Sequence, residues 1–572
     1  MQPKEVWGQA TAFLDRFRRL AWFDFLLLAG LVGAVFGLLS LAGEWREFRP
    51  AVRIDLSPRA LPVYAFYSLS RGLIAYSCSL LFTLTYGYWA AKDRVAQRIL
   101  LPLLDILQSI PVLGFMPGVV LGLVRIFPGS NIGLELASIL MIFTGQAWNM
   151  TFSFYHSVRS VPSDQIEAAT IYHFNWWQRF KWVELPFSMI GLVWNSMMSM
   201  AGGWFFLMIT ESFVLGTKDF RLPGIGSYMS VAVAKGDVRA MLWAIAAMIL
   251  MIVILDQILW RPVVVWSEKF RVEEGASEQT SSSWFYDFLR HSRILEWIGA
   301  ALKKVEASRP RLPRPRRAAV VNSGNNFISL ILLLVLVSGL LFGAWKLIAI
   351  LQQLPRHGFL PILEAGGWTL GRVLLSTALG TLWTLPAGLA IGLSPKLSRI
   401  FQPIVQIAAS FPAPMLFPLV IAALKVAGVS LGWGSVVLML LGTQWYILFN
   451  VIAGAMSIPA DLREASDSYR LNRMMRFRSL YLPAVFPYLV TGWVTAAGGA
   501  WNASIVAEYV TFKGQVLTAN GLGAAISVAA ERADFPSLAA SVIVMAAIVV
   551  LFNRNVWRRL YTLAETRFSL SK

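Results

Sequence analysis

Apolar runs of about 20 residues recur along the whole chain, separated by shorter polar segments. A helical run of this length crosses a hydrocarbon core about 30 Å thick. We predict six spans in each half of the chain, at residues 22–42, 68–90, 107–126, 133–157, 189–214 and 241–265, then 327–350, 369–392, 411–428, 431–455, 486–508 and 537–556. The hydropathy pattern therefore predicts an all-α membrane protein with about twelve transmembrane helices.

Composition supports this fold class, because 57% of the 572 residues are hydrophobic and 14% are charged. The first apolar run is long for a signal peptide, and we interpret it as a retained span. If the N-terminus is inside, the loops after the second and fourth spans of each half face the cytoplasm. Basic residues gather beside these inner ends, at Lys92, Arg94, Arg98, Lys396 and Arg399. The positive-inside rule and anionic lipid thus explain the net charge of +19, and nucleic acid is not expected as a partner.

Two polar stretches between spans, 162–186 and 459–483, repeat one another at a constant offset of 297 residues (464 − 167 = 297). The first reads PSDQIEAATIYHFNWWQRFKWVELP and the second PADLREASDSYRLNRMMRFRSLYLP. The same offset pairs residues outside these stretches: Trp148, Gly202, Trp204, Glu211, Gly224, Gly226, Asp237, Trp260 and Arg261 with Trp445, Gly499, Trp501, Glu508, Gly521, Gly523, Asp534, Trp557 and Arg558.

Earlier positions repeat at an offset of 301 residues, and these are Ser68, Arg71, Ser109, Pro111 and Pro117 with Thr369, Arg372, Ser410, Pro412 and Pro418. Since six spans separate equivalent points, both halves have the same orientation in the membrane. This predicts parallel repeats about an axis along the membrane normal, with a transport pathway at their interface.

The two polar stretches resemble the EAA loop of permeases of binding-protein-dependent ABC importers. The resemblance implies the type I permease fold, in which a short cytoplasmic helix pair docks on an ATPase. It assigns ATPase coupling to Glu167, Ala168, Ala169, His173, Phe180, Pro186, Glu464, Ala465, Ser466, Arg470, Phe477 and Pro483. Where the family pattern has glycine, six residues after the glutamate, this chain has His173 and Arg470.

The resemblance also implies partners and a location. We expect two copies of a cytoplasmic ABC ATPase, an extracytoplasmic substrate-binding protein, membrane lipid, and the bacterial inner membrane. This chain has no phosphate-binding loop of the Gly-x-x-x-x-Gly-Lys-Ser/Thr type, so ATP and Mg are expected on the ATPases. Cys78 is the only cysteine, and the four histidines lack metal-ligand spacing. The chain is therefore predicted to be a transport subunit and not an enzyme, with no metal site.

Shorter motifs are closer to permeases of the nitrate, sulfonate/taurine and bicarbonate type. They are Ser109-Ile-Pro111 with Pro117, Trp204 with Glu211, Gly224-Ile-Gly226, and their counterparts in the second half. This resemblance implies a small anion as cargo. The alternatives are a fused permease of a ferric-iron or thiamine importer and an ion-coupled secondary transporter, for which a charged, broken span at mid-membrane is typical.

Candidate pathway residues are the polar and aromatic groups of the fourth and fifth spans, namely Gln146, Trp204, Thr210, Glu211, Gln444, Trp501, Asn502, Ser504 and Glu508. A spacing of seven residues places each Trp and Glu of a fifth span on one helix face. Because a carboxylate repels an anion, a paired structural or gating role is favoured for both glutamates over contact with cargo. The tryptophans suit a pathway wall or plain packing, and the two glutamines favour interhelical hydrogen bonds.

Residues 267–326 join a first repeat, 1–266, to a second, 327–572. Residues 284–305 carry apolar side chains at helical spacing between basic ones, which predicts a helix lying on the inner leaflet. The run 309–317 is rich in Arg and Pro, and anionic headgroups are expected to attract it.

Overall fold

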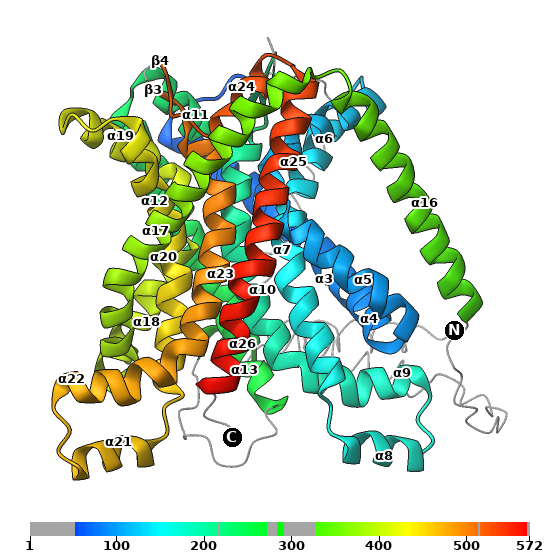
Figure 1. Ribbon diagram of the computed structural model, residues 1–572, viewed down its shortest axis with the longest axis vertical. Coiled ribbons are helices and arrows are strands. Elements are labelled where there is room, and N and C mark those ends of the chain that lie inside the picture. The colour runs from blue at the N-terminus through cyan, green and yellow to red at the C-terminus, as the bar shows by residue number, and fades with distance from the viewer. Residues whose placement is uncertain (1–51, 216–217, 271–282, 291–325, 513–514, 569–572) are drawn as a thin grey trace, which may run out of the picture.

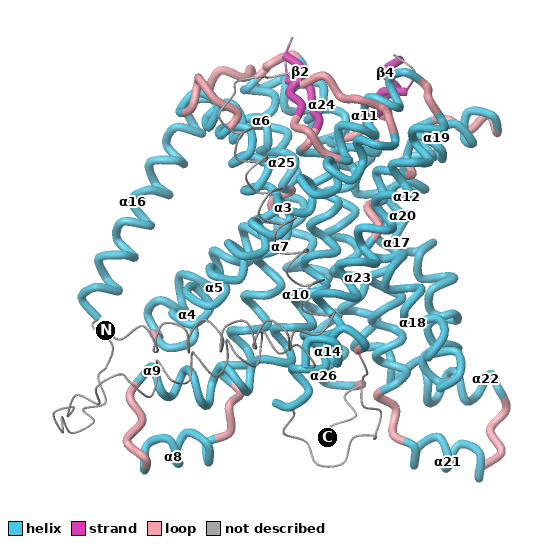
Figure 2. The backbone as a smooth tube through the Cα atoms, turned by 180° about the vertical axis from the view of Figure 1, so that it is seen from behind, coloured by secondary structure: helices cyan, strands magenta, loops and turns pink. Residues whose placement is uncertain are grey.

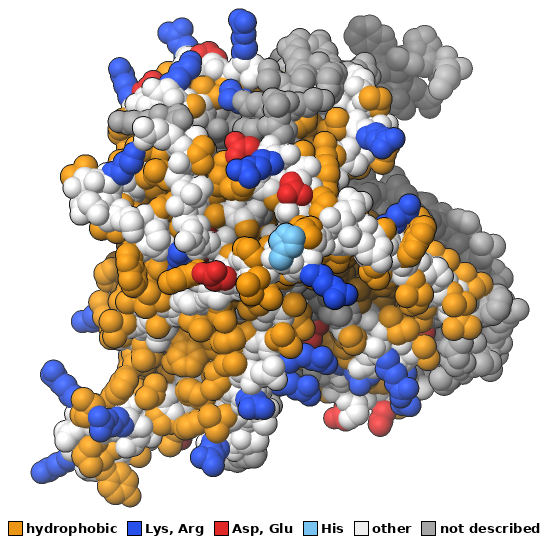
Figure 3. Space-filling model, turned by 45° about the horizontal axis from the view of Figure 1, so that its top comes forward, with side chains coloured by type: hydrophobic (Ala, Val, Ile, Leu, Met, Phe, Trp, Pro, Cys, Tyr) orange, Lys and Arg blue, Asp and Glu red, His pale blue; other side chains and the backbone are white. Residues whose placement is uncertain are grey.

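The computed structural model describes residues 52–215, 218–270, 283–290, 326–512 and 515–568. The first predicted span, the basic run of the linker and most of its predicted helix lie outside these residues. Within them, seven helices are long and apolar enough to cross a membrane. Figure 3 shows broad hydrophobic areas on one face, with Lys and Arg projecting at its upper and lower edges.

The first repeat is built on helices that run between the two ends of the molecule (Figure 1). Its long members are α3 (Leu61–Phe82), α7 (Ile132–Arg159), α10 (Leu185–Thr210) and α12 (Val238–Leu255). Shorter helices join or extend them: α4 (Tyr88–Lys92), α5 (Arg94–Ser109), α6 (Val112–Ile126), α8 (Ser163–Ile171), α9 (Trp176–Arg179), α11 (Ile225–Lys235) and α13 (Arg261–Ser267). A hairpin of β1 (Ser212–Leu215) and β2 (Lys218–Arg221) pairs Ser212 with Arg221.

The second repeat has the same order of elements. Its long helices are α16 (Asn326–Leu351), α17 (Phe359–Leu393), α20 (Leu431–Met456), α23 (Leu482–Ala507) and α25 (Phe535–Phe552). The shorter ones are α18 (Pro395–Ser410), α19 (Phe417–Val426), α21 (Ala460–Ser468), α22 (Arg473–Arg476), α24 (Leu522–Glu531) and α26 (Arg558–Arg567). The hairpin of β3 (Tyr509–Phe512) and β4 (Gln515–Thr518) pairs Tyr509 with Thr518. A single described helix of the linker, α14 (Trp284–Arg290), lies between the repeats in sequence.

Short π-helical segments confirm the register of the duplication. They lie at Phe180–Glu184 and Asp256–Trp260 in the first repeat and at Phe477–Tyr481 and Asn553–Trp557 in the second, each pair 297 residues apart. The two hairpins and α24 lie at one end of the molecule, and α8, α9, α21 and α22 lie at the other (Figure 2). Both predicted cytoplasmic stretches therefore lie at the same end of the molecule, as parallel repeats require.

The third predicted span of each half requires a correction, because neither forms one continuous helix. In the first repeat the chain is extended at Ile110 (ψ 122°), and α5 ends before it while α6 begins after Pro111. In the second, Phe411 (ψ 129°) precedes Pro412, and α19 is only 10 residues long. Proline forces the preceding residue out of the helical region and supplies no N–H, which explains both breaks.

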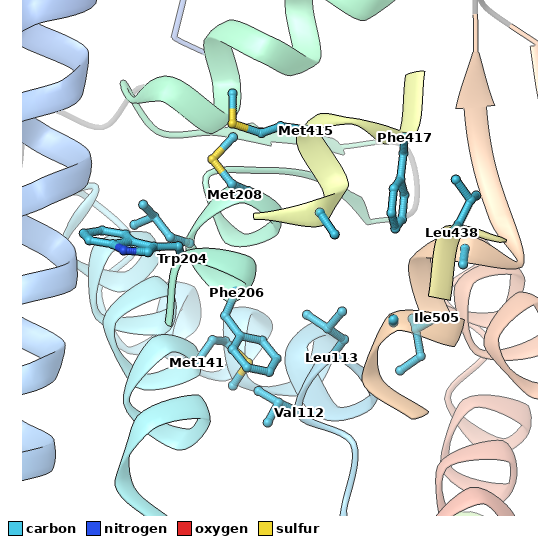
Figure 4. Packing of buried hydrophobic residues seen from close by; sticks show 14 of the residues in the cluster. Val112, Leu113, Met141, Trp204, Phe206, Met208, Met415, Phe417, Leu438 and Ile505 are labelled. Carbon is cyan, nitrogen blue, oxygen red and sulfur yellow. The ribbon is translucent and has the colours of Figure 1, made fainter. Parts of the chain in front are cut away.

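The repeats interlock instead of lying side by side. α23 contacts α6 of the first repeat, and α10 contacts α18 of the second. Their shared core contains Val112, Phe206 and Met208 from one repeat and Met415 and Ile505 from the other (Figure 4). In α16, 6% of the most apolar window is buried, so this helix presents its leucines and isoleucines outward, as lipid contact requires.

Candidate functional site

A cavity of about 220 Å³ lies where the two repeats meet. Both repeats contribute equivalent elements to it: the ends of α5 and α18, one face of α7 and α20, and one face of α10 and α23. Its polar lining is neutral, since none of the described residues that line it is Asp, Glu, Lys or Arg. The polar lining residues are Gln108, Thr144, Trp148, Asn149, Tyr446, Thr495, Trp501, Asn502 and Asn553.

Two of the nine predicted pathway residues, Trp501 and Asn502, line this cavity. Asn502 also joins the repeats, because its Oδ1 accepts a hydrogen bond of 2.8 Å from the N–H of Val112. Its counterpart at the 297 offset is Phe205, which lines the same cavity. The two fifth helices therefore present different side chains to it, an amide from α23 and a phenyl ring from α10.

The other predicted pathway residues lie away from the cavity and are held by neighbouring helices. Trp204 is 2% exposed and packs on Gly72 of α3, whose place for a Cβ lies 2.9 Å from its ring. Thr210 shares a hydrogen bond of 2.8 Å with Ser138. Ser504 donates to a carbonyl of its own helix.

Both predicted glutamines make interhelical contacts. Gln146 lies within 3.4 Å of Ser79 of α3 and Met200 of α10. Gln444 accepts a bond of 3.0 Å from the Trp383 indole of α17. Gly203 allows α10 to pack closely on α7, since a Cβ on Gly203 would lie 2.4 Å from the Gln146 amide.

A buried ion cluster closes the outer end of the first repeat. Arg71 of α3 is fully buried, and its Nε and Nη2 donate to the two carboxylate oxygens of Glu135 of α7 at 2.5 and 2.7 Å. Its Nη1 donates to Glu211, at the end of α10, and to the carbonyl of Pro223, both at 2.8 Å. One guanidinium thus holds α3, α7, α10 and the start of α11 together.

The Glu211 carboxylate is saturated with donors. It accepts hydrogen bonds from the Ser68 hydroxyl at 2.6 Å and from the N–H of Gly226 at 2.7 Å, besides the bond from Arg71. Glycine is required at position 224, because a Cβ there would lie 2.3 Å from the carboxylate. The Gly224-Ile-Gly226 motif therefore makes room for the buried carboxylate of Glu211 and donates a hydrogen bond to it.

The second repeat rebuilds the cluster with one change. Glu508 accepts from Arg372 at 2.7 Å, from Thr369 at 3.0 Å and from the N–H of Gly523 at 2.8 Å. Nη1 of Arg372 also donates to the carbonyl of Asn520, as Arg71 does to Pro223. At the place of Glu135 the second repeat has Gly432, whose carbonyl accepts from Nε of Arg372 at 3.1 Å.

Sequence reasoning found Arg71 and Arg372 as repeated positions but missed that they pair with the glutamates. The available signal was a lone arginine within an otherwise apolar span in both halves, since a buried charge needs a partner. Glu135 could be recognised in the same way, as a carboxylate near the start of the fourth span. Because the second repeat has Gly432 at the position equivalent to Glu135, comparing the two repeats did not reveal the pairing of Arg71 with Glu135.

The two predicted coupling loops share one backbone conformation. α8 ends in a Schellman motif, in which the N–H groups of His173 and Phe174 donate to the carbonyls of Thr170 and Ala169 at 3.0 and 2.9 Å. His173 has φ +51°, and so does Arg470 in the second loop. The bend that the family makes with glycine is therefore kept without it.

Each loop carries exposed side chains on the inner end of the molecule. Glu167, Ala168, Glu464 and Ala465 are exposed, whereas Ala169 and Ser466 are buried against the loop. Phe180 and Phe477, in the π-segments, are partly buried, as are Pro186 and Pro483 at the starts of α10 and α23. The predicted coupling residues thus divide into an exposed surface and a set that joins the loop to the fifth helix.

No break separates a coupling loop from the helix that lines the cavity. In the first repeat α9, its π-segment and α10 run as one helix from Trp176 to Thr210, and in the second the equivalent helix runs from Arg473 to Ala507. Each is 35 residues long, or about 50 Å at 1.5 Å per residue. Each predicted coupling loop is therefore joined to the cavity wall by one continuous helix.

A second cavity, of about 470 Å³, lies toward the hairpin end. Both repeats line it, and four methionines, Met116, Met208, Met229 and Met415, form much of its apolar wall. Tyr509 and Glu531 are at its rim, where burial and then the nearby carboxylate raise the pKa of Tyr509 to about 12. Flexible thioethers let such a wall change shape as the repeats move.

Comparison with known proteins identifies the class of this molecule. The family described as "Binding-protein-dependent transport system inner membrane component" matches residues 83–259 and 380–556, more than half of the chain. The chain belongs to this family and contains two copies of its domain. The predictions of an internal duplication, a type I permease fold and an inner-membrane location are thereby confirmed.

Relatives of this chain include permeases named for nitrate, bicarbonate and taurine. The chain is 28% identical over 148 residues to the nitrate import permease protein NrtB of Leptolyngbya laminosa, covering 25% of this chain and 52% of that protein. It is 28% identical over 142 residues to the bicarbonate transport system permease protein CmpB of Synechocystis sp. (25% and 49%), and 25% identical over 195 residues to the taurine transport system permease protein TauC of Escherichia coli (34% and 67%).

The chain spans about half the length of the curated relatives it matches first. Among solved structures, it is similar to an inward-facing MetNI methionine ABC transporter, with 20% identity, a TM-score of 0.31, and coverage of 37% of this chain and 99% of that chain. The chain is an ABC importer permease related to those of the nitrate, bicarbonate and taurine systems.

Proposed function

We propose that this chain forms the complete membrane pathway of an ATP-driven importer for a small anion, with both halves of the usual permease pair in one polypeptide. The observation that carries the proposal is the continuous helix from each coupling loop to the wall of the shared cavity. It joins a surface suited to an ATPase with a space suited to cargo.

The exposed loops are the proposed contacts for two ABC ATPases, one for each repeat. Their surfaces offer large apolar side chains to a partner: Trp176 is 68% exposed, Trp177 53%, and Met474 58%. Bound ATP and Mg would belong to those ATPases, whose closure would draw α8 and α21 together. α10 and α23 would then separate toward the outer end, opening the cavity to cargo from a binding protein.

A neutral polar lining suits passage of an anion better than its tight capture. Amide, hydroxyl and indole groups donate hydrogen bonds without a fixed positive charge, so an anion is stabilised and still leaves. The 220 Å³ cavity has room for an ion of the size of nitrate, bicarbonate or a small sulfonate. The names of the nitrate, bicarbonate and taurine relatives support a small anion as cargo, and an uptake assay identifies which anion is transported.

The coupling proposal is tested by charge reversal at Glu167 and Glu464, both exposed and both on the docking surface. We expect the double variant Glu167→Lys with Glu464→Lys to assemble with its ATPases and to lose uptake. Glu364→Lys, an exposed glutamate near the start of α17 and outside the loops, is the matched control and should transport normally. Full transport by the double variant would refute the coupling role.

A further inference from the structure

The replacement of Glu135 by Gly432 is the one departure from repeat symmetry in the outer clusters described above. The other contacts of the arginine, with the fifth-span glutamate and with the carbonyl before the Gly-x-Gly motif, are repeated, and in both repeats a hydroxyl donates to that glutamate. The two arginines therefore have equivalent positions but different partners on one edge of the guanidinium.

That edge is the one with which an arginine binds a carboxylate through two parallel hydrogen bonds. Arg71 uses Nε and Nη2 in this way to hold Glu135. In Arg372 the Nε donates to the Gly432 carbonyl, and Nη1 is occupied by Glu508 and Asn520. Among the described residues Nη2 of Arg372 has no acceptor, although the side chain is only 11% exposed.

The space for an acceptor is present. A Cβ built on Gly432 would meet only the Ser430 hydroxyl at 3.7 Å and Nη2 of Arg372 at 3.9 Å, which are ordinary contact distances. A side chain can therefore begin at position 432 without a clash, in the direction of Nη2 of Arg372. Ser430 is exposed, so water and solutes reach this space.

Further donors converge on the same space. Gly432 is the second residue of α20, a helix of 26 residues whose first N–H groups lack partners within the helix. The N-terminal end of such a helix favours negative charge. Ser430, the N-cap residue, makes no side-chain capping bond, so its hydroxyl is free to donate to a ligand.

The formal charges of the two clusters differ by one unit. Arg71 with Glu135 and Glu211 sums to −1 in formal charge, whereas Arg372 with Glu508 sums to zero. A monovalent anion beside Arg372 would give the second cluster the formal charge that the first already has. In the first repeat the Glu135 carboxylate already occupies the equivalent place beside Arg71.

We propose that the second repeat binds a small planar oxyanion, of the carboxylate, nitrate or bicarbonate class, in the place of the Glu135 carboxylate. Its ligands are Nη2 of Arg372, the Ser430 hydroxyl and the N–H groups at the start of α20. The site lies at the outer end and is separate from the central cavity. It holds either an ambient anion or arriving cargo, and it does not depend on the proposed ATPase coupling.

The test measures thermal unfolding of the purified full chain in detergent, with a bulky sulfonate (HEPES), which has no planar carboxylate, as the background anion at constant ionic strength. Formate and nitrate are titrated in, and each should raise Tm saturably by a few degrees. Gly432→Glu supplies the carboxylate covalently and should raise Tm without added anion and abolish the response. Gly432→Gln has the same size without the charge; it should abolish the response without the rise.

A second variant tests whether the same kind of site can be created in the first repeat. Glu135→Gly should lose stability in the sulfonate buffer and recover part of it with formate, because the small anion replaces the deleted carboxylate. Absence of any saturable response in the unmodified chain, or equal responses in it and in Gly432→Glu, would overturn the proposal. Uptake by Gly432→Glu separates the two sources: it is retained if the site holds an ambient anion and reduced if the site receives cargo.

Discussion

Neutralising Glu508 should harm this protein more than neutralising its repeat counterpart, Glu211. In Glu508→Gln the amide keeps the shape of the side chain but presents N–H to at least one donor among Arg372, Thr369 and Gly523. It also removes the only carboxylate that Arg372 contacts among the described residues. Breaking a buried ion pair from one side costs about 3–5 kcal/mol.

In Glu211→Gln the same hydrogen bonds are disturbed, but Arg71 keeps its two-bond contact with Glu135. The loss is then that of hydrogen bonds to a charged group, about 1.5–3 kcal/mol. The difference between the two variants arises from Glu135 alone, since the remaining contacts of the clusters are equivalent. We therefore expect the cost in Glu508→Gln to be about twice that in Glu211→Gln.

Thermal unfolding in detergent measures this difference, with a bulky sulfonate (HEPES) as the anion so that no small carboxylate replaces the missing charge. For a unit of 150–250 residues, 1 kcal/mol corresponds to about 2–4 °C in Tm. Glu508→Gln should then lower Tm by roughly 6–20 °C, and Glu211→Gln by about half as much in the same buffer. Equal decreases in Tm, or a larger decrease in Glu211→Gln, would show that Glu135 does not stabilise the buried charge of Arg71.

Three further outcomes are expected. Gly145→Ala should lower Tm and expression, because its Cβ would lie 2.2 Å from a phenyl ring, whereas Gly498→Ala, with no atom within 4 Å, should be silent. His173→Gly and Arg470→Gly should each stabilise the chain by up to about 1 kcal/mol by relieving φ +51°, with ATPase stimulation unchanged; lost stimulation would show that those side chains touch the partner. Asn502→Leu loses the hydrogen bond that joins α23 to Val112 of the other repeat, and it should therefore raise ATP hydrolysis in the absence of substrate. An unchanged rate would count against the idea that this bond keeps the two repeats together at rest.

The sequence was sufficient for the features that follow from periodicity and repetition. Span positions follow from apolar length except in the third span of each half, which is broken at Pro111 and Pro412, and the orientation of the two halves follows from six intervening spans. The coupling loops could be located because Glu167 and Glu464 lie in register. The left-handed turn at His173 was not predicted, because the chain has His173 and Arg470 where the family pattern has glycine, and neither is the residue usually chosen for such a turn.

The sequence could not predict which polar residues of a helix reach the cavity. Asn149 and Trp148 lie on α7 at its contact with the cavity, and Gln146, two residues earlier, faces α3 and α10 instead. The choice depends on how α7 is rotated against α10, which is set by packing such as that of Gly145 on Phe206. Single-span periodicity contains no information about that rotation.

The sequence also could not predict which buried charges pair with one another, and the reason is physical. Arg71 and Glu135 are separated by 64 residues, and Arg71 and Glu211 by 140, so no local pattern joins them. Burial requires that each charge find a partner, but several carboxylates were available in the first repeat. Only the folded arrangement of α3, α7 and α10 selects among them.

The most direct test of the account is reconstitution of the tagged chain with its host's ABC ATPase and binding protein in lipid nanodiscs and proteoliposomes. We predict a stable complex of one chain with two ATPases, ATP hydrolysis stimulated by the anion-loaded binding protein, and anion uptake that requires ATP. A chain that purifies alone and transports with an ion gradient and no ATPase would contradict the account.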